Sequence, residues 1–317
     1  MTRSIEKSRI RTKVDELTNS SHSESKTDPQ YVKMTVASRF ATILLVLLFG
    51  GARLVSGIIG GSVADPSRYP YFTGYIVTRN VTGSKRMHSG ILIAPDVVLA
   101  NAWYMSDYGG GVLSIKAWVN KTSIKKSRFE YERNVRFWML HPEYSDETWD
   151  HNIALLFLDG PITEVPLAKL NRKSSVPRTG QSLTELGFGV TNDNPYEYPE
   201  HLMEVTVDTV PFDVCDKAAS PPPVFEDRSF CAGSVRHGSC WYDEGGPMLD
   251  LSGGRSADAD KDVLVGIIDS STLETSTIGT DDERCLMPGY PGYFTKVSFY
   301  ADCRLDRLQC SRTLAVP

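Results

Sequence analysis

Short runs of β-forming residues recur along residues 71–297, and this spacing constrains the possible folds most strongly. The runs are rich in Val, Ile, Tyr and Phe, and Gly, Pro, Asn or Asp bounds them. Because no helical pattern intervenes, they predict an all-β chain of antiparallel sandwiches or barrels. We expect strands at 71–78, 90–93, 97–100, 112–119, 135–140, 153–158, 183–190, 203–210, 263–268 and 292–297, and a short helix near 297–308.

The first 57 residues are predicted to contain a polar tail and a targeting sequence and no folded domain. Residues 1–33 are polar and predict a disordered tail. Residues 40–52 form an apolar run that is too short to span a bilayer, which needs roughly 20 residues. Residues 34–57 are therefore interpreted as a signal sequence with a possible short pro-segment, and Met34 as a candidate start. A cleaved signal sequence implies a secreted chain without a stable membrane anchor. The less favoured alternative is a type II membrane anchor.

The remaining composition fits an exported globular chain. A net charge of −5 and a pI near 5.7 argue against a nucleic-acid partner. An even number of cysteines, six, favours disulfides, and the absence of zinc-type Cys/His spacing predicts no metal site and no cofactor. Asn80 and Asn120 each begin a glycosylation sequon.

Several blocks, taken in order, resemble the trypsin and chymotrypsin-like serine proteases. They include residues 58–61 (Ile-Ile-Gly-Gly), 89–104, 231–233 (Cys-Ala-Gly) and 239–247 (Ser-Cys-Trp-Tyr-Asp-Glu-Gly-Gly-Pro). The resemblance covers essentially all of residues 58–300. It implies two six-stranded antiparallel β-barrels, at about 58–160 and 161–300, with a C-terminal helix that ends within residues 301–317.

The resemblance also implies disulfides Cys215–Cys231 and Cys240–Cys285. Cys303 and Cys310 are left over, and their partners stay open. Seven residues apart on one helix, they would lie about 10 Å from each other along the axis, too far to bridge.

The resemblance places different residues at each position of the family's catalytic triad. Trp103 stands at the position of the general-base histidine, Asn152 at the orienting aspartate and Glu244 at the nucleophilic serine. An indole cannot accept the proton of a nucleophile, and losing one triad member costs about 10⁴–10⁶ in rate. We therefore expect no serine-protease activity and predict that the chain is not an enzyme.

The neighbouring positions of the cleft are also changed. Tyr242 replaces the oxyanion-hole glycine, and its Cβ disfavours the permissive backbone that a glycine provides. Gly238 stands where trypsin has an acidic residue. Asp269, Ser270 and Ser271 replace the Ser-Trp-Gly segment that lines the substrate in the family.

Two hypotheses concern pairs of residues, His88 with Tyr104 and Asp243 with Ile58. His88 and Tyr104 occupy positions of a family disulfide, so they either face each other as a polar pair or are two unrelated surface residues. Asp243 is implied to bind the amino terminus of Ile58 after cleavage. Signal processing after Gly57 would expose Ile58 directly, whereas cleavage after Ala52 would leave an extension that cannot insert.

The sequence therefore predicts a secreted, catalytically inactive serine-protease homologue that acts by binding an extracellular protein, as an inhibitor, decoy or cofactor. It is similar in type to the glucanase-inhibitor proteins of oomycetes. The alternative is a hydrolase with a rearranged site that uses Asp243 and Glu244 as a carboxylate pair.

Overall fold

The computed structural model describes residues 58–79, 85–106, 111–125, 131–193, 196–214, 225–235, 237–251, 258–270 and 291–301. All of them belong to one unit, Leu54–Pro317, and the other unit, Met1–Arg53, lies outside the described residues. The predicted tail, signal sequence and C-terminal residues 302–317 also lie outside them. No helix among the described residues is long and apolar enough to cross a membrane.

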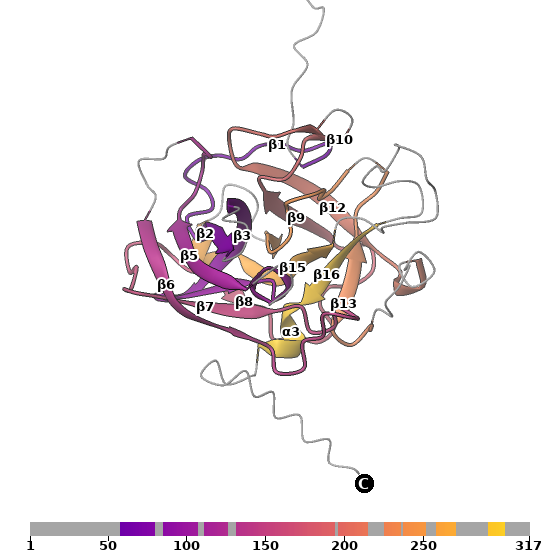
Figure 1. Ribbon diagram of the computed structural model, residues 1–317. Coiled ribbons are helices and arrows are strands. Elements are labelled where there is room, and N and C mark those ends of the chain that lie inside the picture. The colour runs from indigo at the N-terminus through magenta and orange to yellow at the C-terminus, as the bar shows by residue number, and fades with distance from the viewer. Residues whose placement is uncertain are drawn as a thin grey trace, which may run out of the picture. The chain divides into compact units, whose positions relative to one another are not determined.

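Six strands close the first barrel in the order β2-β3-β4-β7-β6-β5, and all neighbours are antiparallel (Figure 1). Its core side chains are large and fully buried, for example Tyr71, Phe72, Ile91 and Leu156. The short 3-10 helix η1 (Trp103–Met105) follows β4. The strands are β2 (Phe72–Arg79), β3 (Lys85–Ala94), β4 (Val97–Ala100), β5 (Val112–Val119), β6 (Tyr131–Leu140) and β7 (Ala154–Leu158).

The second barrel closes through six antiparallel strands in the order β12-β13-β16-β15-β14-β9, because β9 also pairs with β12. The two-residue strands β1 and β8 extend this sheet, and β10 and β11 form a separate ribbon. The strands are β1 (Ser62–Val63), β8 (Lys169–Leu170), β9 (Ser182–Gly187), β10 (Asn192–Asp193), β11 (Tyr196–Glu197), β12 (Met203–Val210), β13 (Ser229–Ala232), β14 (Pro247–Asp250), β15 (Val263–Ser270) and β16 (Gly292–Lys296).

The described residues also include the helical turns η2 (Ala259–Lys261) and α3 (Val297–Tyr300). The helix expected near 297–308 is present at its start, and the rest of it lies outside the described residues. The prediction of two six-stranded antiparallel barrels is confirmed. Residues 62–63, placed with the first barrel in the sequence analysis, pair instead with β12 of the second.

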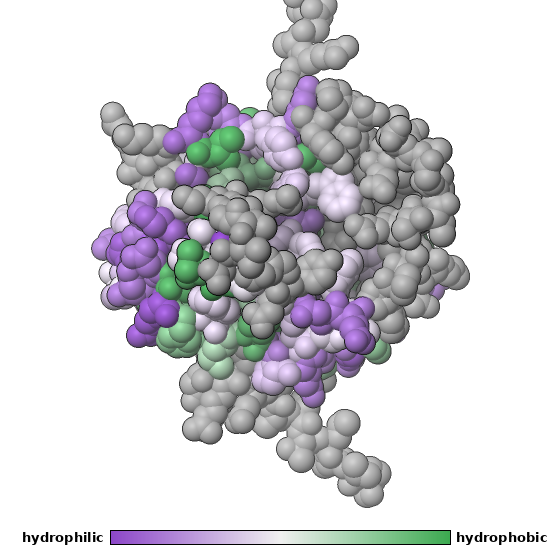
Figure 2. Space-filling view, in the orientation of Figure 1, coloured by the Kyte–Doolittle hydropathy of each residue, from purple (hydrophilic) through white to green (hydrophobic). Residues whose placement is uncertain are grey.

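The outer side of the first barrel is polar. In β6, exposed residues recur between partly buried ones, as expected for a strand with one face toward water. Figure 2 shows a hydrophilic patch at the left edge of the molecule, where Figure 1 places β6. The exposed residues of β6 are therefore mostly polar, although Phe137 in the same strand is 41% exposed.

Candidate functional site

Trp103 and Asn152, which the sequence analysis assigned to one site, lie together. The N–H of Trp103, in η1, donates to Oδ1 of Asn152 (2.9 Å). Nδ2 of Asn152 donates to Oδ1 of Asp269 (2.5 Å), and Thr295 donates to the other carboxyl oxygen (3.0 Å). The buried amide of Asn152 therefore connects η1 of the first barrel to β15 of the second.

Glu244 places its carboxyl group among hydrogen-bond donors. The hydroxyl of Tyr104 donates to Oε2 (2.8 Å), and the backbone N–H groups of Tyr242 and of Glu244 itself also donate to the carboxyl group. The resemblance assigns Tyr242 to the oxyanion hole, so the side chain of Glu244 itself occupies the N–H group at that position. Burial nevertheless raises the pKa of Glu244 to about 6, and the Asp269 charge contributes to the rise.

Asp269 is the second carboxyl group of the site. Burial raises its pKa to about 6, against the hydrogen bonds from Asn152 and Thr295, which lower it. The resemblance places Asp269 at the start of the segment that lines the substrate. Its contact with Asn152 has no signal in the sequence, because the two residues are 117 positions apart.

His88 and Tyr104 form a stacked pair. Their ring centroids are 3.6 Å apart with planes 28° apart, and His88 is 4% exposed. The structure thus favours the paired interpretation of these two residues over that of unrelated surface residues. The contact is between ring faces, which leaves the Tyr104 hydroxyl directed at Glu244.

Tyr242 adopts a backbone conformation that favours glycine. Its φ is +76°, in the left-handed region, where a non-glycine residue costs about 1–2 kcal/mol. Its ring lies 5.7 Å from that of Tyr198. The chain therefore retains the left-handed turn before Glu244 although the residue there carries a Cβ.

Asp243 lies close to Glu244 in sequence but bonds elsewhere. Its carboxyl oxygens accept from the N–H groups of Gly189 (2.7 Å) and Cys240 (2.9 Å), and the residue is fully buried. Burial raises its pKa to about 8, and Glu244 adds to the rise. Among the described residues no cationic group pairs with Asp243, and the expected amine of Ile58 stays a prediction.

Ile58 and Gly238 lie at the edge of the second barrel. The Ile58 side chain is fully buried in that barrel's core, with φ at +46°. The N–H of Gly238 donates to the carbonyl oxygen of Ile59 (3.0 Å), and Gly238 has φ at +139°. Residues 58–59 are therefore held against the segment that leads to Glu244.

Glu185, on β9, is a buried acid that the sequence analysis missed. It is fully buried, and the hydroxyl and backbone N–H of Ser239 lie near its carboxyl group without forming a hydrogen bond of good geometry. Burial, followed by repulsion from Asp243, raises its pKa to about 8. Glu185 sits within a predicted strand of mostly apolar residues, where a single acid carries no signal of burial.

Other predicted residues are only partly described. Neither Cys231 nor Cys240 is a free thiol, but Cys215 and Cys285 lie outside the described residues, so the pairing stays a prediction. Ser270 ends β15, while Ser271 and Asn80 lie outside the described residues. Asn120 follows β5 with φ at +61°. Cys303 and Cys310 are likewise outside.

Comparison with known proteins agrees with this architecture. A family model described as Trypsin matches residues 58–303. A trypsin of Phaedon cochleariae is 30% identical over 260 residues, covering 77% of this chain and 86% of that protein. A trypsin of Saccharopolyspora erythraea is 26% identical over 255 residues, with 79% and 98% covered. Serine protease VLSP-1 of Macrovipera lebetinus is 25% identical over 271 residues, with 84% and 94% covered.

These relatives correct one expectation. From Trp103, Asn152 and Glu244 we predicted that the chain is not an enzyme. The matching family and the similar proteins are named as trypsins and serine proteases, and they point to an enzyme. The prediction failed because it treated three positions, aligned by resemblance alone, as sufficient to exclude every chemistry of the site.

Proposed function

Because the chain belongs to the trypsin family of serine proteases, we propose that it acts on other proteins by binding an extracellular partner through the face around Glu244. Such binding would serve as inhibition, as a decoy or as a cofactor. The observation that carries the proposal is a set of aromatic side chains, two of them exposed, that extends through ring contacts from Tyr104 and Tyr242, the two residues that contact the carboxyl group of Glu244.

The aromatic set consists of Trp103, Tyr104, Trp149, Tyr198 and Tyr242. Trp103 lies 4.9 Å from the Tyr104 ring and 6.2 Å from that of Trp149, measured between centroids. Trp149 is 38% exposed and Tyr198 is 52% exposed. Because Trp and Tyr are enriched among the residues that dominate protein–protein binding, the exposed members of this set favour a protein partner.

The polar groups beneath the aromatic set are already satisfied by one another. Tyr104 and two backbone N–H groups bind Glu244, and Asn152 binds both Trp103 and Asp269. A network in which each group has a partner holds the side chains in one arrangement. The surface offered to a partner is therefore preorganised, which lowers the entropic cost of binding.

Affinity capture tests this proposal. The purified chain is immobilised and exposed to extracellular fluid, together with the double variant Trp149→Ala/Tyr198→Ala. We expect the wild type to retain a protein that the double variant loses. Leu113→Ala is the matched control, because Leu113 is 64% exposed on β5 of the polar barrel side. Equal capture by all three proteins would refute binding through this face.

A second candidate function is hydrolysis, the reaction of the family, carried out here by carboxyl groups instead of a serine. The specific observation is that Glu244 and Asp269 both have a pKa of about 6 in a buried site, so one can donate and the other accept a proton near neutral pH. Asp243 is less suitable than Asp269, because two backbone N–H groups hold its carboxyl group.

Mixed peptide and glycoside substrates test the second candidate. We expect any turnover to follow a bell-shaped pH profile centred near 6 and to disappear in Glu244→Gln and Asp269→Asn. Turnover that persists in both variants would exclude these two carboxyl groups.

Secretion and glycosylation at Asn80 and Asn120 are further parts of the proposal. They are supported by the apolar run before residue 58 and by the frequent secretion of trypsin-like proteases. The likeness in type to glucanase-inhibitor proteins stays a prediction. Mass spectrometry of the chain recovered from the medium tests glycosylation at Asn80 and at Asn120.

A further inference from the structure

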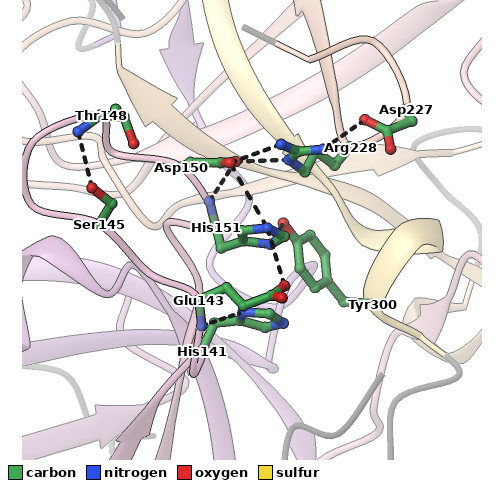
Figure 3. Close-up of polar contacts among 9 residues, drawn as sticks. All are labelled: His141, Glu143, Ser145, Thr148, Asp150, His151, Asp227, Arg228 and Tyr300. Atoms are coloured by element: carbon green, nitrogen blue, oxygen red, sulfur yellow. Dashed lines mark hydrogen bonds and ion pairs between the residues drawn. The ribbon is translucent and has the colours of Figure 1, made fainter. Parts of the chain in front are cut away.

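Two histidines and a glutamate converge on the loop between β6 and β7, beside α3. His141 directly follows β6, and His151 lies shortly before β7 (Figure 3). One ligand atom from each of His141, Glu143 and His151 lies within 4.8 Å of the others. Both histidines are buried, whereas the Glu143 side chain is 74% exposed. The loop thus presents two nitrogen donors and one oxygen donor at a single point.

His151 and Glu143 already have the separation that a metal ion requires. Nε2 of His151 lies 3.4 Å from Oε2 of Glu143. In a tetrahedral site with bonds of about 2.0–2.1 Å, neighbouring ligand atoms are about 3.3–3.4 Å apart. One ion can therefore bind both atoms with almost no movement of either side chain.

Tyr300 of α3 holds the His151 ring by its other nitrogen. Nδ1 of His151 lies 3.1 Å from the Tyr300 hydroxyl. A hydrogen bond from Nδ1–H to that oxygen leaves the Nε2 lone pair free to face Glu143. Metal-binding histidines commonly donate their second N–H in this way, which fixes the tautomer and the ring orientation.

His141 completes the donor set after a local adjustment. Its ring stacks on that of His151, with centroids 4.4 Å apart and planes 6° apart. Nδ1 of His141 accepts a hydrogen bond from the N–H of Glu143 at 3.2 Å, at the long end of the usual range. Rotation of the ring about its Cβ–Cγ bond gives up this contact and turns a nitrogen toward the ion.

The charges around the cluster favour a cation. Asp150 forms a two-point ion pair with Arg228 (2.7 Å each), and Asp227 contacts the same guanidinium (3.0 Å). With Glu143, which contacts His151, the group holds three carboxylates and one arginine, so it is two negative charges in excess apart from the imidazoles. A divalent ion compensates this excess.

We propose that His141, Glu143 and His151 bind one divalent transition-metal ion of the Zn²⁺ type. Two imidazoles and a carboxylate suit Zn²⁺, Co²⁺ or Ni²⁺, whereas Ca²⁺ and Mg²⁺ prefer oxygen ligands throughout. The ion binds His151, which also contacts the Tyr300 hydroxyl, so it links the β6–β7 loop to α3 through this histidine. His151 directly precedes Asn152, and the ion therefore holds this end of the loop in place. The sequence analysis expected no metal site because its search was for short Cys/His spacings, whereas these histidines meet across a loop.

Direct titration of the full secreted chain, without a histidine tag, tests the site. Zn²⁺ binding is measured by calorimetry and by competition with a chromophoric chelator, and bound Co²⁺ by its visible absorption. We expect one ion per chain and a higher melting temperature with Zn²⁺. His151→Gln and Glu143→Gln should weaken binding by about 10–100-fold or more. Tyr300→Phe should weaken it less.

The controls make each outcome decisive. His201→Gln removes an exposed histidine outside the cluster and should leave Zn²⁺ affinity unchanged. If His151→Gln does not fold by circular dichroism, Glu143→Gln decides, because its side chain is mostly exposed. No binding at about 1 mM Zn²⁺, equal binding of Ca²⁺, or unchanged affinity in Glu143→Gln would overturn the proposal.

Discussion

At the scale of single residues, Glu244 illustrates how burial and hydrogen bonding oppose each other. Three donors stabilise its ionised form, yet burial prevails and raises its pKa to about 6. The hydroxyl of Tyr104 is the donor that can be removed without changing the backbone. The balance at Glu244 is therefore open to direct measurement.

Tyr104→Phe should raise the pKa of Glu244 further above 6, because the lost hydrogen bond favours the carboxylate. At neutral pH it should lower the free energy of unfolding by about 1–3 kcal/mol. Carboxyl NMR titration and urea unfolding measure the two effects. Tyr131→Phe on β6 is the control, and a Glu244 pKa unchanged from wild type would contradict the assigned contact.

Glu185 should make the stability of the chain depend on pH. Its pKa is raised from 4.5 to about 8, so the folded state binds this proton more tightly than the unfolded state. That stabilisation is complete below about pH 4.5 and is lost as the pH rises through 8. Each unit of difference in pKa corresponds to about 1.4 kcal/mol.

Glu185→Gln cannot ionise, so it should lose less stability than wild type between pH 5 and pH 8.5. Urea unfolding at several pH values gives the comparison. Glu164→Gln, an exposed substitution, is the control and should follow wild type. If the free energy of unfolding of Glu185→Gln falls with pH as steeply as that of wild type, Glu185 is not the source of the pH dependence.

At the scale of elements, the end of β9 is shaped by one buried carboxyl group. We predicted a strand over 183–190, but β9 ends at Gly187 because the chain then curves around Asp243. A Cβ at Gly187 would lie 1.9 Å from Oδ1 of Asp243, and one at Gly189 would lie 2.4 Å from its Cγ. Only glycine leaves room for Asp243 at these positions.

Gly189→Ala should therefore destabilise the fold by more than about 3 kcal/mol or prevent folding. Gly160→Ala provides a matched control, since its Cβ would meet only the Arg133 side chain at 3.5 Å. Thermal unfolding of both variants gives the answer. Similar melting temperatures for the two would show that Asp243 moves easily and that β9 is not fitted to it.

At the scale of the whole molecule, the sequence was sufficient for the fold. Expected strands at 97–100, 112–119 and 203–210 coincide with β4, β5 and β12, because their Val- and Ile-rich runs have clear turn boundaries. β13 and β14 were not predicted. Each has four residues and adjoins a glycine-containing block, residues 231–233 for β13 and residues 239–247 for β14. Runs this short beside glycines and polar residues give no clear strand pattern.

The candidate site could be predicted only in part, since its geometry depends on contacts between distant segments. Trp103, Asn152 and Glu244 were identified: Trp103 and Asn152 share a hydrogen bond, and Glu244 is bonded to Tyr104, the residue after Trp103. Glu185 was missed, because a lone acid in a strand gives no signal of what it will face. Asp269 was placed in the substrate-lining segment, but its hydrogen bond to Asn152 was not predicted. The expectation of an inactive chain failed for a related reason: residue identity at three positions does not describe the whole site.

Processing of the chain is a prediction at the same scale. If cleavage follows Gly57, the amine of Ile58 becomes available to Asp243, whose pKa of about 8 reflects burial without a cationic partner among the described residues. N-terminal sequencing of the secreted protein should return Ile-Ile-Gly-Gly. A mature chain that begins at Arg53 would leave Asp243 without that amine.

Hydrogen–deuterium exchange of the complex with its captured partner tests the central claim most directly. Binding through the face around Glu244 predicts slower exchange in residues 101–106, 147–153 and 239–246, with β5 and β6 unchanged. Protection confined to β5 and β6, with these three segments exchanging as in the free chain, would contradict the account.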